Sequence, residues 1–596
     1  MRDALARAYR EPRADWEDRV WRARRIGRAQ PAVVRAVEAV YARGRRAGRY
    51  AANQAVLHAT AALDEARTLP LPLDADADEI SDAAQKLADR CLAGPQGRRR
   101  RPLRPAAALV PAEYVAHARG LCERMGISPA SWARMICPVW WRRQLRRRLG
   151  RVAEHAARRL GIVQAQGECY VSDWAVERRR SQDRAIAAWL ASRDLVCTAA
   201  PTAEECGRVL DMVPVVASSL AHPAKRYAEC MVRVAGAQDY ADEKGHAAFF
   251  VTVTCPSRFH SHHKAGGANA MYAGATPRDA QAYLCRVWAR TRALWHAAGL
   301  ALYGLRVAEP HHDGCPHWHI LLFAPAPTLL AALAIFRGQA MADSPDEPGA
   351  ADARFKAVAI DRAQGSAVGY VAKYLAKGLT TDGALSAYDL DWYGNDAATA
   401  VERIRAWATL WGIRQYQFFG MPSVGPWREL RRLRDGMPGG PHAAAWTAAD
   451  AGNWGAYMIA QDRAPLGLWR AWDASPGRYG DPRGWRTLGV ECAGAEFATR
   501  AYSWRAAAKI GVGLPPRIGG TNCKTQPIGE IRYEKPRYGG NDIAGPGRPG
   551  RYRRVASGES ARGGGKVAIR RTERGRRAAY RGGEGRGAGI RRGPAQ

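Results

Sequence analysis

The chain lacks several features that would place it in a common class. Its twelve cysteines include no C-x-x-C pair, which argues against a zinc ribbon or a redox pair, and their scatter suits a cytoplasmic protein. No apolar run reaches the roughly eighteen residues that span a membrane. The first residues hold no apolar stretch of the secretory type, so we expect no signal peptide. No glycine-rich loop ends in Gly-Lys-Ser or Gly-Lys-Thr, so a fused helicase motor is not predicted.

Acidic residues are also few relative to basic ones. The 596 residues include 91 Lys+Arg against 56 Asp+Glu, a net charge of +35. This excess favours a polyanionic partner, and nucleic acid is the one we expect. The hydrophobic fraction of 47% supports more than one folded core. A basic cluster that includes Arg142 and Arg143 lies in a region of helical pattern. It suits contact with a phosphate backbone, and a solvated helix face explains it equally well.

From about residue 247 the pattern alternates between strand and helix. The order β-α-β-β-α-β predicts a ferredoxin-like (split βαβ) arrangement, with an antiparallel sheet that has helices on one face and the other face free. Thr276 and Pro277 begin the first helix as cap and first helical residue. A further helix and strand over 400–435 should extend the domain. The predicted strands are 249–254, 302–309, 317–323 and 354–360, and the predicted helices begin at 277 and 327.

Two histidines in the third of these strands suggest a metal site. His317 and His319 are two residues apart, so both imidazoles point to one face of a strand and Trp318 points to the other. Glu309 ends the preceding strand, and the turn folds His317 back beside it. Two imidazoles and a carboxylate with open positions suit Mg²⁺ or Mn²⁺. We prefer Glu309 because residues of a turn are less fixed. The rival ligands in that turn are His311, His312 and Asp313.

A short helix predicted from Ser366 to Gly378 carries two candidate nucleophiles. Tyr370 and Tyr374 share one helical stripe with Lys373 and Lys377, and the apolar residues fall on the other side. An isolated Y-x-x-x-Y is usually structural, but the nearby metal motif favours chemistry. A metal would polarise a scissile phosphate, and a tyrosine hydroxyl would attack phosphorus while a lysine stabilises the charge. The phosphotyrosine would keep the bond energy, so the strand could be rejoined without a nucleotide cofactor.

The His317-Trp318-His319 element with its two-tyrosine helix resembles the HUH endonucleases that start rolling-circle replication. More closely, the chain resembles the bacteriophage GPA-type replication endonucleases over about residues 165–435. Cys315 stands where the resemblance leads us to expect Thr; it faces the turn and should not alter ligation. The matching stretches are Tyr170–Asp173, Thr252–Arg258, Gly274–Arg278, Arg306–Phe323, Tyr370–Tyr374, Trp411–Gln415 and Trp427–Arg431.

The resemblance implies a site- and strand-specific nick at a phage replication origin. One tyrosine would open the origin and hold its 5′ end, the 3′-OH would prime synthesis, and the other tyrosine would cut the regenerated origin. The implied partners are origin DNA, single-stranded or supercoiled, with a host helicase and DNA polymerase. The implied site comprises catalytic Tyr370, Tyr374, Lys373 and Lys377, metal ligands Glu309, His317 and His319, and DNA contacts by Arg258, Arg306, Arg142 and Arg143.

The fold class expected is therefore α+β, an HUH endonuclease domain between a mainly helical N-terminal region and a disordered basic tail. The predicted division is 1–110, helices and linker of unknown role; 111–240, a helical basic region in contact with DNA; 241–440, the endonuclease; 441–515, a small helical region; and 516–596, a Gly/Arg-rich tail.

Two other functions fit part of the sequence. A relaxase or single-strand transposase would share the nick but differ in substrate, and the paired tyrosines favour replication. A non-enzymatic DNA-binding protein would explain the charge equally well but would leave the Glu/His cluster without a role.

Overall fold

A five-stranded antiparallel sheet forms the core around the predicted site. Its spatial order is β6-β3-β5-β4-β7. The four predicted strands and both predicted helices are present, and β7 adds a fifth strand at the β4 edge, as expected for 400–435. The computed structural model describes residues 13–97, 110–361, 366, 368–369, 396–433 and 441–509. The strands are β3 (Ala247–Val253), β4 (Tyr303–Pro310), β5 (Pro316–Ala324), β6 (Phe355–Ala359) and β7 (Tyr416–Phe419).

One face of the sheet packs against α13 (Pro277–Ala297) and α14 (Ala326–Met341). The α13 helix begins as predicted: the Asp279 N–H donates to Thr276 Oγ1 at 3.3 Å, and the Thr276 N–H donates to the Asp279 carboxylate at 2.9 Å. Trp318 of β5 is 1% exposed and meets Trp288 of α13 edge to face. Thus Trp318 points away from the two histidines, as the alternation of a strand requires.

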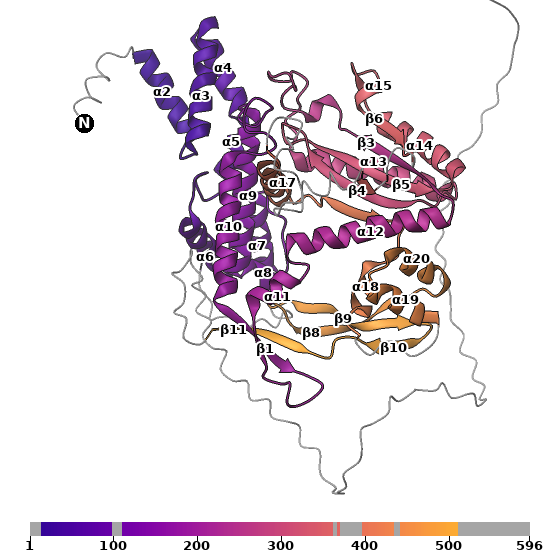
Figure 1. Ribbon diagram of the computed structural model, residues 1–596. Coiled ribbons are helices and arrows are strands. Elements are labelled where there is room, and N and C mark those ends of the chain that lie inside the picture. Colours follow the sequence, from indigo (N-terminus) through magenta and orange to yellow (C-terminus); the bar gives the residue numbers. More distant parts are fainter. Residues whose placement is uncertain are drawn as a thin grey trace, which may run out of the picture. The chain divides into compact units, whose positions relative to one another are not determined.

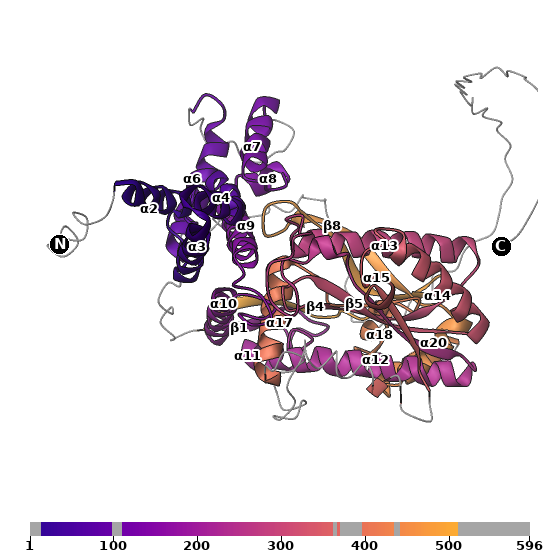
Figure 2. The ribbon, with the colours of Figure 1, turned by 90° about the horizontal axis from the view of Figure 1, so that it is seen from above.

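The opposite face was predicted to be free, and that prediction is wrong. The helix α12 (Pro223–Glu243) crosses it, and Figure 2 shows the sheet between α13 and α12. Val234 and Ala237 of α12 pack on this face with Leu305 and Leu321 of the sheet. Three further helices complete the cover: α18 (Val424–Leu430), α19 (Pro441–Asp450) and α20 (Trp454–Arg463). Apolar residues on both faces of β4 and β5 require cover on both sides.

The N-terminal region is mainly helical, as predicted. Its longest helix, α9 (Pro138–Arg159), contacts α17 (Ala397–Trp411), and Arg151 of α9 donates to the Leu410 carbonyl at 3.0 Å (Figure 1). The remaining helices here are α2 (Arg13–Ile26), α3 (Pro31–Gly44), η1 (Arg45–Ala47), α4 (Arg49–Ala59), α5 (Ala61–Asp64), η2 (Glu65–Thr68), α6 (Ala77–Ala93), α7 (Ala112–Arg124), α8 (Trp132–Met135), α10 (Asp173–Ala191) and α11 (Met212–Ser218).

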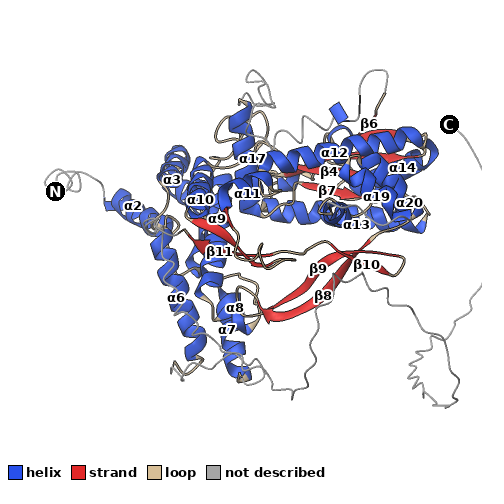
Figure 3. Cartoon of the chain, turned by 60° about the horizontal axis from the view of Figure 1, so that its bottom comes forward, coloured by secondary structure: helices blue, strands red, loops and turns tan. Residues whose placement is uncertain are grey.

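Two regions predicted to be helical contain strands. Within 111–240, β1 (Arg193–Ala199) pairs with β2 (Val209–Asp211) and with β11 (Ser503–Ala508). Within 441–509, the described part of the predicted helical region, only α19 and α20 are helical. After them β8 (Gly467–Pro476) and β9 (Pro482–Cys492) form the long hairpin seen in Figure 3, and β10 (Ala495–Ala498) pairs with β9. The predicted small helical region is therefore corrected to two helices followed by strands.

The described residues all fall within one unit, Met1–Lys524. The predicted Gly/Arg-rich tail, 516–596, lies outside the described residues. Over the described part of the chain, no helix is both long and apolar enough to cross a membrane. Short elements near the sheet are η4 (Ser257–Phe259) and α15 (Ala350–Ala353).

Candidate metal centre and strand-cleavage site

The hairpin of β4 and β5 brings the predicted metal ligands together. Glu309 lies directly opposite His317 in the antiparallel register, and Val307 lies opposite His319. Glu309, His317 and His319 therefore share one face of two adjacent strands. This confirms that the turn folds His317 back beside Glu309.

The three side chains converge at their polar ends. One ligand atom from each of Glu309, His317 and His319 lies within 4.8 Å of the others. The two Nε2 atoms are 2.9 Å apart, and His319 Nε2 is 3.9 Å from Glu309 Oε2. Glu309 and His319 are buried, and His317 is half-buried. We call these three residues the Glu/His triad. It is the one cluster of at least three possible ligands found within the described ranges.

Two residues of β3 hold His319 in place. The Thr252 hydroxyl lies 3.0 Å from His319 Nδ1, since Thr252 is directly opposite His319 in the β3–β5 register. The Phe250 ring stacks on the His319 imidazole with centroids 5.5 Å apart. An Nδ1 occupied by a hydroxyl leaves Nε2, the atom that faces the triad, for a ligand. Sequence analysis gave Thr252 no role, because strand register cannot be read from the sequence.

The turn between the strands is buried and fixed. The sequence analysis preferred Glu309 over the turn residues because it expected such residues to be less fixed, and that reason is wrong. Asp313 is 0% exposed, and its carboxylate accepts the N–H groups of Ser261 at 2.8 Å and Cys315 at 3.0 Å. Burial alone would raise the pKa of Asp313, but the charges of His260 and Arg158 hold it well below its usual value. Asp313 is thus a structural carboxylate that fixes the turn.

A segment of the N-terminal region supports this turn from outside the sheet. Arg158 of α9 donates to the Asp313 carbonyl at 2.6 Å, and the Tyr170 N–H donates to the His312 carbonyl at 3.0 Å. Gly314 has φ +79°, and a Cβ there would meet the Tyr170 carbonyl at 3.0 Å. These contacts cross the predicted boundary at residue 240, so α9 and the segment after it belong structurally with the sheet.

The candidate nucleophiles Tyr370 and Tyr374 lie outside the described residues, as do Lys373 and Lys377. Of the helix predicted to carry them, Ser366, Val368 and Gly369 are described. The Gly369 N–H donates to Ser366 Oγ at 3.0 Å, the bond expected of an N-cap serine. The Val368 N–H donates to Gln238 Oε1 of α12 at 3.3 Å, and the Val368 side chain packs in the core on the triad side of the sheet. Val368 therefore lies over the face that carries the Glu/His triad.

Residues 124–382 match the bacteriophage replication gene A protein (GPA) family. These residues, somewhat less than half of the chain, are therefore similar to that family. The match includes the whole β4–β5 hairpin with the Glu/His triad. It extends from α7 beyond the start of the predicted tyrosine helix, so the helices that support the turn fall within it.

Curated relatives agree with the family. The chain is 39% identical over 306 residues to a probable replication protein P12 of Pseudoalteromonas phage PM2, covering 51% of this chain and 46% of the relative. It is 38% identical over 348 residues to the replication gene A protein of Escherichia phage 186, covering 56% and 48%. It is 34% identical over 432 residues to a probable replication endonuclease from prophage-like region 2 of Salmonella typhi, covering 66% and 53%. The chain thus spans about half the length of these relatives. No solved structure matches it.

Two of the four arginines predicted to bind DNA are engaged within the protein. Arg306 is 4% exposed, and its guanidinium lies over the Trp318 ring at 3.9 Å, on the face away from the triad. Arg258 is ion-paired to Asp343 at 2.8 Å. The assignment of Arg306 to DNA is therefore not carried forward. Arg142 and Arg143 lie on α9 and line a cavity of about 990 Å³.

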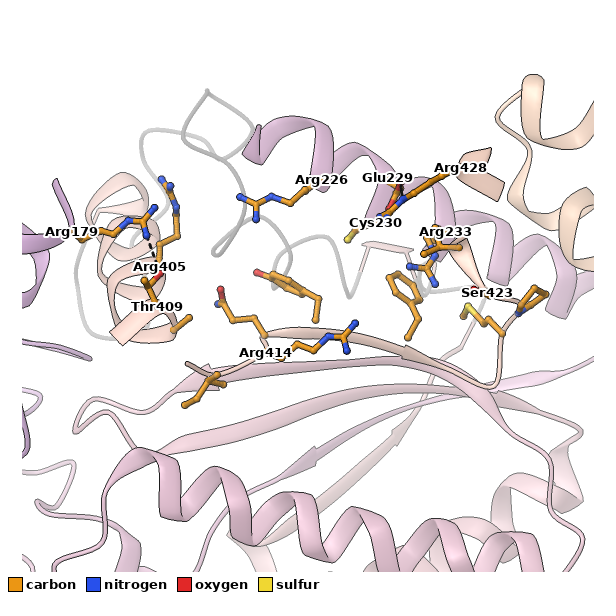
Figure 4. A pocket seen from close by; sticks show the side chains of 18 residues that line it. Arg179, Arg226, Glu229, Cys230, Arg233, Arg405, Thr409, Arg414, Ser423 and Arg428 are labelled. Carbon is orange, nitrogen blue, oxygen red and sulfur yellow. Dashed lines mark hydrogen bonds and ion pairs between the residues drawn. The ribbon is translucent and has the colours of Figure 1, made fainter. Parts of the chain in front are cut away.

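Sequence analysis missed a second basic surface, next to the triad. A cleft of about 750 Å³ lies between α12, α17 and β7 (Figure 4). Arg226 reaches into it from α12, Arg405 from α17, and Arg414 from the segment before β7. Tyr416 of β7 also lines the cleft, and burial, together with the charge of Glu309, raises its pKa well above the usual value. Because these arginines are far apart in sequence, no local motif marks them.

Proposed function

We propose that this protein is a metal-dependent DNA endonuclease that nicks a phage replication origin at one site on one strand. The observation that carries the proposal is the Glu/His triad, buried on one sheet face inside the region that matches the replication gene A family. The strand order β6-β3-β5-β4 supports an HUH domain with a ferredoxin-like (split βαβ) sheet. The relatives named as replication endonucleases support the reaction class.

The donor set fits a divalent cation that binds phosphate oxygens. One carboxylate and two imidazole nitrogens leave coordination positions for other ligands, and the Thr252 contact at His319 Nδ1 leaves Nε2 available. We assign Glu309, His317 and His319 as the ligands of Mg²⁺ or Mn²⁺. When bound, the ion would supply a positive charge to a non-bridging oxygen of the scissile phosphate.

The chain's own nucleophile in this proposal is Tyr370 or Tyr374. The tyrosine oxygen forms a bond to phosphorus, the bond from phosphorus to the 3′ oxygen breaks, and the leaving oxygen takes a proton to become a 3′-OH. Lys373 or Lys377 would stabilise the phenolate or the phosphate. The position of Val368 over the triad face supports this assignment.

The product explains a role in starting rolling-circle replication. The free 3′-OH can prime a host DNA polymerase, with a host helicase opening the duplex, while the phosphotyrosine holds the 5′ end. The second tyrosine would cut the regenerated origin, and the released ends would be rejoined. We place this activity in the cytoplasm of a bacterial host cell.

The test uses the full chain and a supercoiled plasmid that carries a segment of the replicon encoding it. With Mg²⁺ or Mn²⁺, we expect a single nick and protein covalently attached to the 5′ end of the cut strand. EDTA and His319→Ala should each reduce the nick by orders of magnitude while DNA binding persists. Full nicking in EDTA would exclude the metal, and a mobility shift without any cut across the replicon would favour a binding protein instead.

A further inference from the structure

The 750 Å³ cleft beside β7 adjoins the 990 Å³ cavity in which Arg142 and Arg143 lie. Arg179 of α10 and Thr409 of α17 line both spaces, so the two are continuous along one surface. The cleft lies between α12, α17 and β7, and the cavity lies between α9, α10 and α17. Arg478 and Tyr479, at the tip of the β8–β9 hairpin, also line the cavity. We call this surface the arginine track.

Basic side chains dominate the whole track. Six arginines and one acidic residue, Glu229, line the cleft, and seven arginines and no acidic residue line the cavity. Glu229 is already occupied, because Arg428 donates to it from Nε at 2.8 Å. Burial and the nearby charge of Arg142 lower the pKa of Arg146. Such crowding of like charge is costly without an anion, and a chain of phosphates would relieve it.

Several of these arginines are free to bind a ligand. Arg143 and Arg147 project from α9 and are exposed, as are Arg226 and Arg414 in the cleft. None of the four forms an ion pair with an acidic residue of the described chain. Figure 4 shows Arg226 above the space and Arg414 below it, beside the strand. The track thus presents unpaired guanidinium groups over its length.

Aromatic groups interleave with this charge. Trp189 lines the cavity and is 47% exposed, which is unusual for a tryptophan in a structured helix. Tyr479 lines the same cavity from the hairpin tip, which is tied to α8 by Arg134 and Asp481 at 2.6 Å. Trp189 is exposed and Tyr479 is half-buried. Accessible ring faces between basic groups bind unstacked bases, which a duplex does not offer.

The track leads to the Glu/His triad. Tyr416 in the cleft lies opposite Val307 in the β4–β7 register, and Val307 lies opposite His319 in the β4–β5 register. The cleft therefore opens on the same sheet face as the triad, with β7 next to the strand of Glu309 and two strands from that of the histidines.

We propose that the arginine track binds single-stranded DNA and leads it across α17 and β7 to the Glu/His triad. This inference rests on the proposed function, because it names the path of that enzyme's substrate. It assigns strand binding to α9, α10, α12, α17 and the β8–β9 hairpin tip, and so gives the helical region and the C-terminal strands a role in the reaction.

The test compares two pairs of substitutions with a matched control in the full chain. The pairs are R143Q with R147Q in the cavity, and R226Q with R414Q in the cleft. The control is R290Q with R292Q, which removes the same charge from exposed positions on α13, across the sheet. Binding of a labelled mixed-sequence single strand, and of the same sequence as a duplex, is measured at several salt concentrations in EDTA. Thermal unfolding verifies that each variant is folded.

We expect each track pair to weaken single-strand binding roughly tenfold and to lower the slope of log K against log salt by about 1.4, since each lost phosphate contact releases about 0.7 counterion fewer. The control pair should leave both quantities near the wild-type values. Equal slopes for track and control variants, or an equal loss for duplex and single strand, would overturn the proposal.

A second measurement needs no substitution. Irradiation of the wild-type protein with a bromodeoxyuridine-substituted single strand should crosslink Trp189 or Tyr479, read by mass spectrometry. Crosslinks confined to other surfaces would contradict the track. A wild-type chain that fails to nick its replicon but crosslinks at Trp189 would refute the proposed endonuclease alone. If the wild-type chain nicks normally, no crosslink forms at Trp189 or Tyr479, and the track variants bind a single strand as tightly as the wild type, the arginine track alone is refuted.

Discussion

Replacement of Thr252 by valine tests whether the Glu/His triad is a metal centre. The Thr252 hydroxyl is 3.0 Å from His319 Nδ1, and valine keeps the shape of the side chain while removing that oxygen. Without it, the imidazole loses the partner that fixes its orientation and its protonation at Nδ1. Loss of such a contact typically costs 10–100-fold in metal affinity or activity. We therefore expect Thr252→Val to need about tenfold or more Mn²⁺ for half-maximal nicking, which corresponds to about 1.4 kcal/mol or more.

The assay has two independent readouts. Mn²⁺ binding is measured directly by electron paramagnetic resonance of the free ion, and the nicking rate is measured as a function of Mn²⁺ concentration. The expected pattern is a weaker Mn²⁺ affinity with a nearly normal rate at saturating metal. Thr254→Val is the matched control. Thr254 lies two residues after Thr252, and its hydroxyl donates to the Ala353 carbonyl at 2.9 Å instead of contacting His319.

Two results would refute the reasoning. If Thr252→Val and Thr254→Val shift the Mn²⁺ dependence equally, the effect does not come from the contact between Thr252 and His319. If Thr252→Val binds Mn²⁺ as tightly as the wild type, His319 does not depend on Thr252 for its orientation. Both variants should unfold within about 1 kcal/mol of the wild type, since single hydrogen bonds contribute about this much.

Three further perturbations have defined outcomes. Tyr370→Phe with Tyr374→Phe should abolish the covalent protein–DNA adduct, seen by gel electrophoresis, while Tyr416→Phe should retain it although Tyr416 lies on the sheet face of the triad; an adduct in the double variant would overturn the assignment. His155 is buried, and desolvation lowers its pKa to about 3, so its contribution to stability is present above its unfolded pKa and lost as pH falls below about 6.5. His155→Leu should therefore reduce the loss of unfolding free energy between pH 7 and pH 5 by about 2 kcal/mol, measured by denaturant titration, and an unchanged pH profile would contradict this. Truncation after Pro515 should flatten the salt dependence of DNA binding and leave nicking of a saturating single-stranded origin oligonucleotide intact; equal salt slopes would show that the tail does not touch DNA.

The sequence predicted the Glu/His triad because its geometry is local. Two residues on one strand share a face by alternation, and a tight hairpin brings the end of the preceding strand beside them. The structure agrees with the choice of Glu309 over the turn residues. It does not agree with the reason given, which was that residues of the turn would be less fixed. Asp313 is held by Ser261 and Arg158, which are far away in sequence, and no local pattern showed that the turn would be buried and fixed.

Other errors have equally specific causes. Arg306 was assigned to DNA, although it is three residues from Glu309 on the same strand and so must point to the opposite face, where it stacks on Trp318. The strands β8 and β9 were missed because they show no regular apolar alternation. Trp472 and Trp485 are exposed and pair with each other across the hairpin. Because these large apolar residues do not face a core, the apolar pattern of the sequence did not indicate strands.

Acidic residues neutralise the arginines in some parts of the protein and not in others. The net charge of +35 alone did not distinguish a DNA-binding surface from a generally arginine-rich one. In the N-terminal helices, arginines are neutralised by nearby acids, as in Arg22 with Glu38 at 2.8 Å and Arg28 with Glu79 at 2.8 Å. Along the arginine track, Arg143 and Arg226 have no such partner in the described chain. These two arginines therefore keep a charge that no described acid neutralises, and the cleft that Arg226 lines opens on the same sheet face as the Glu/His triad. Their position beside the site favours a binding path that serves it.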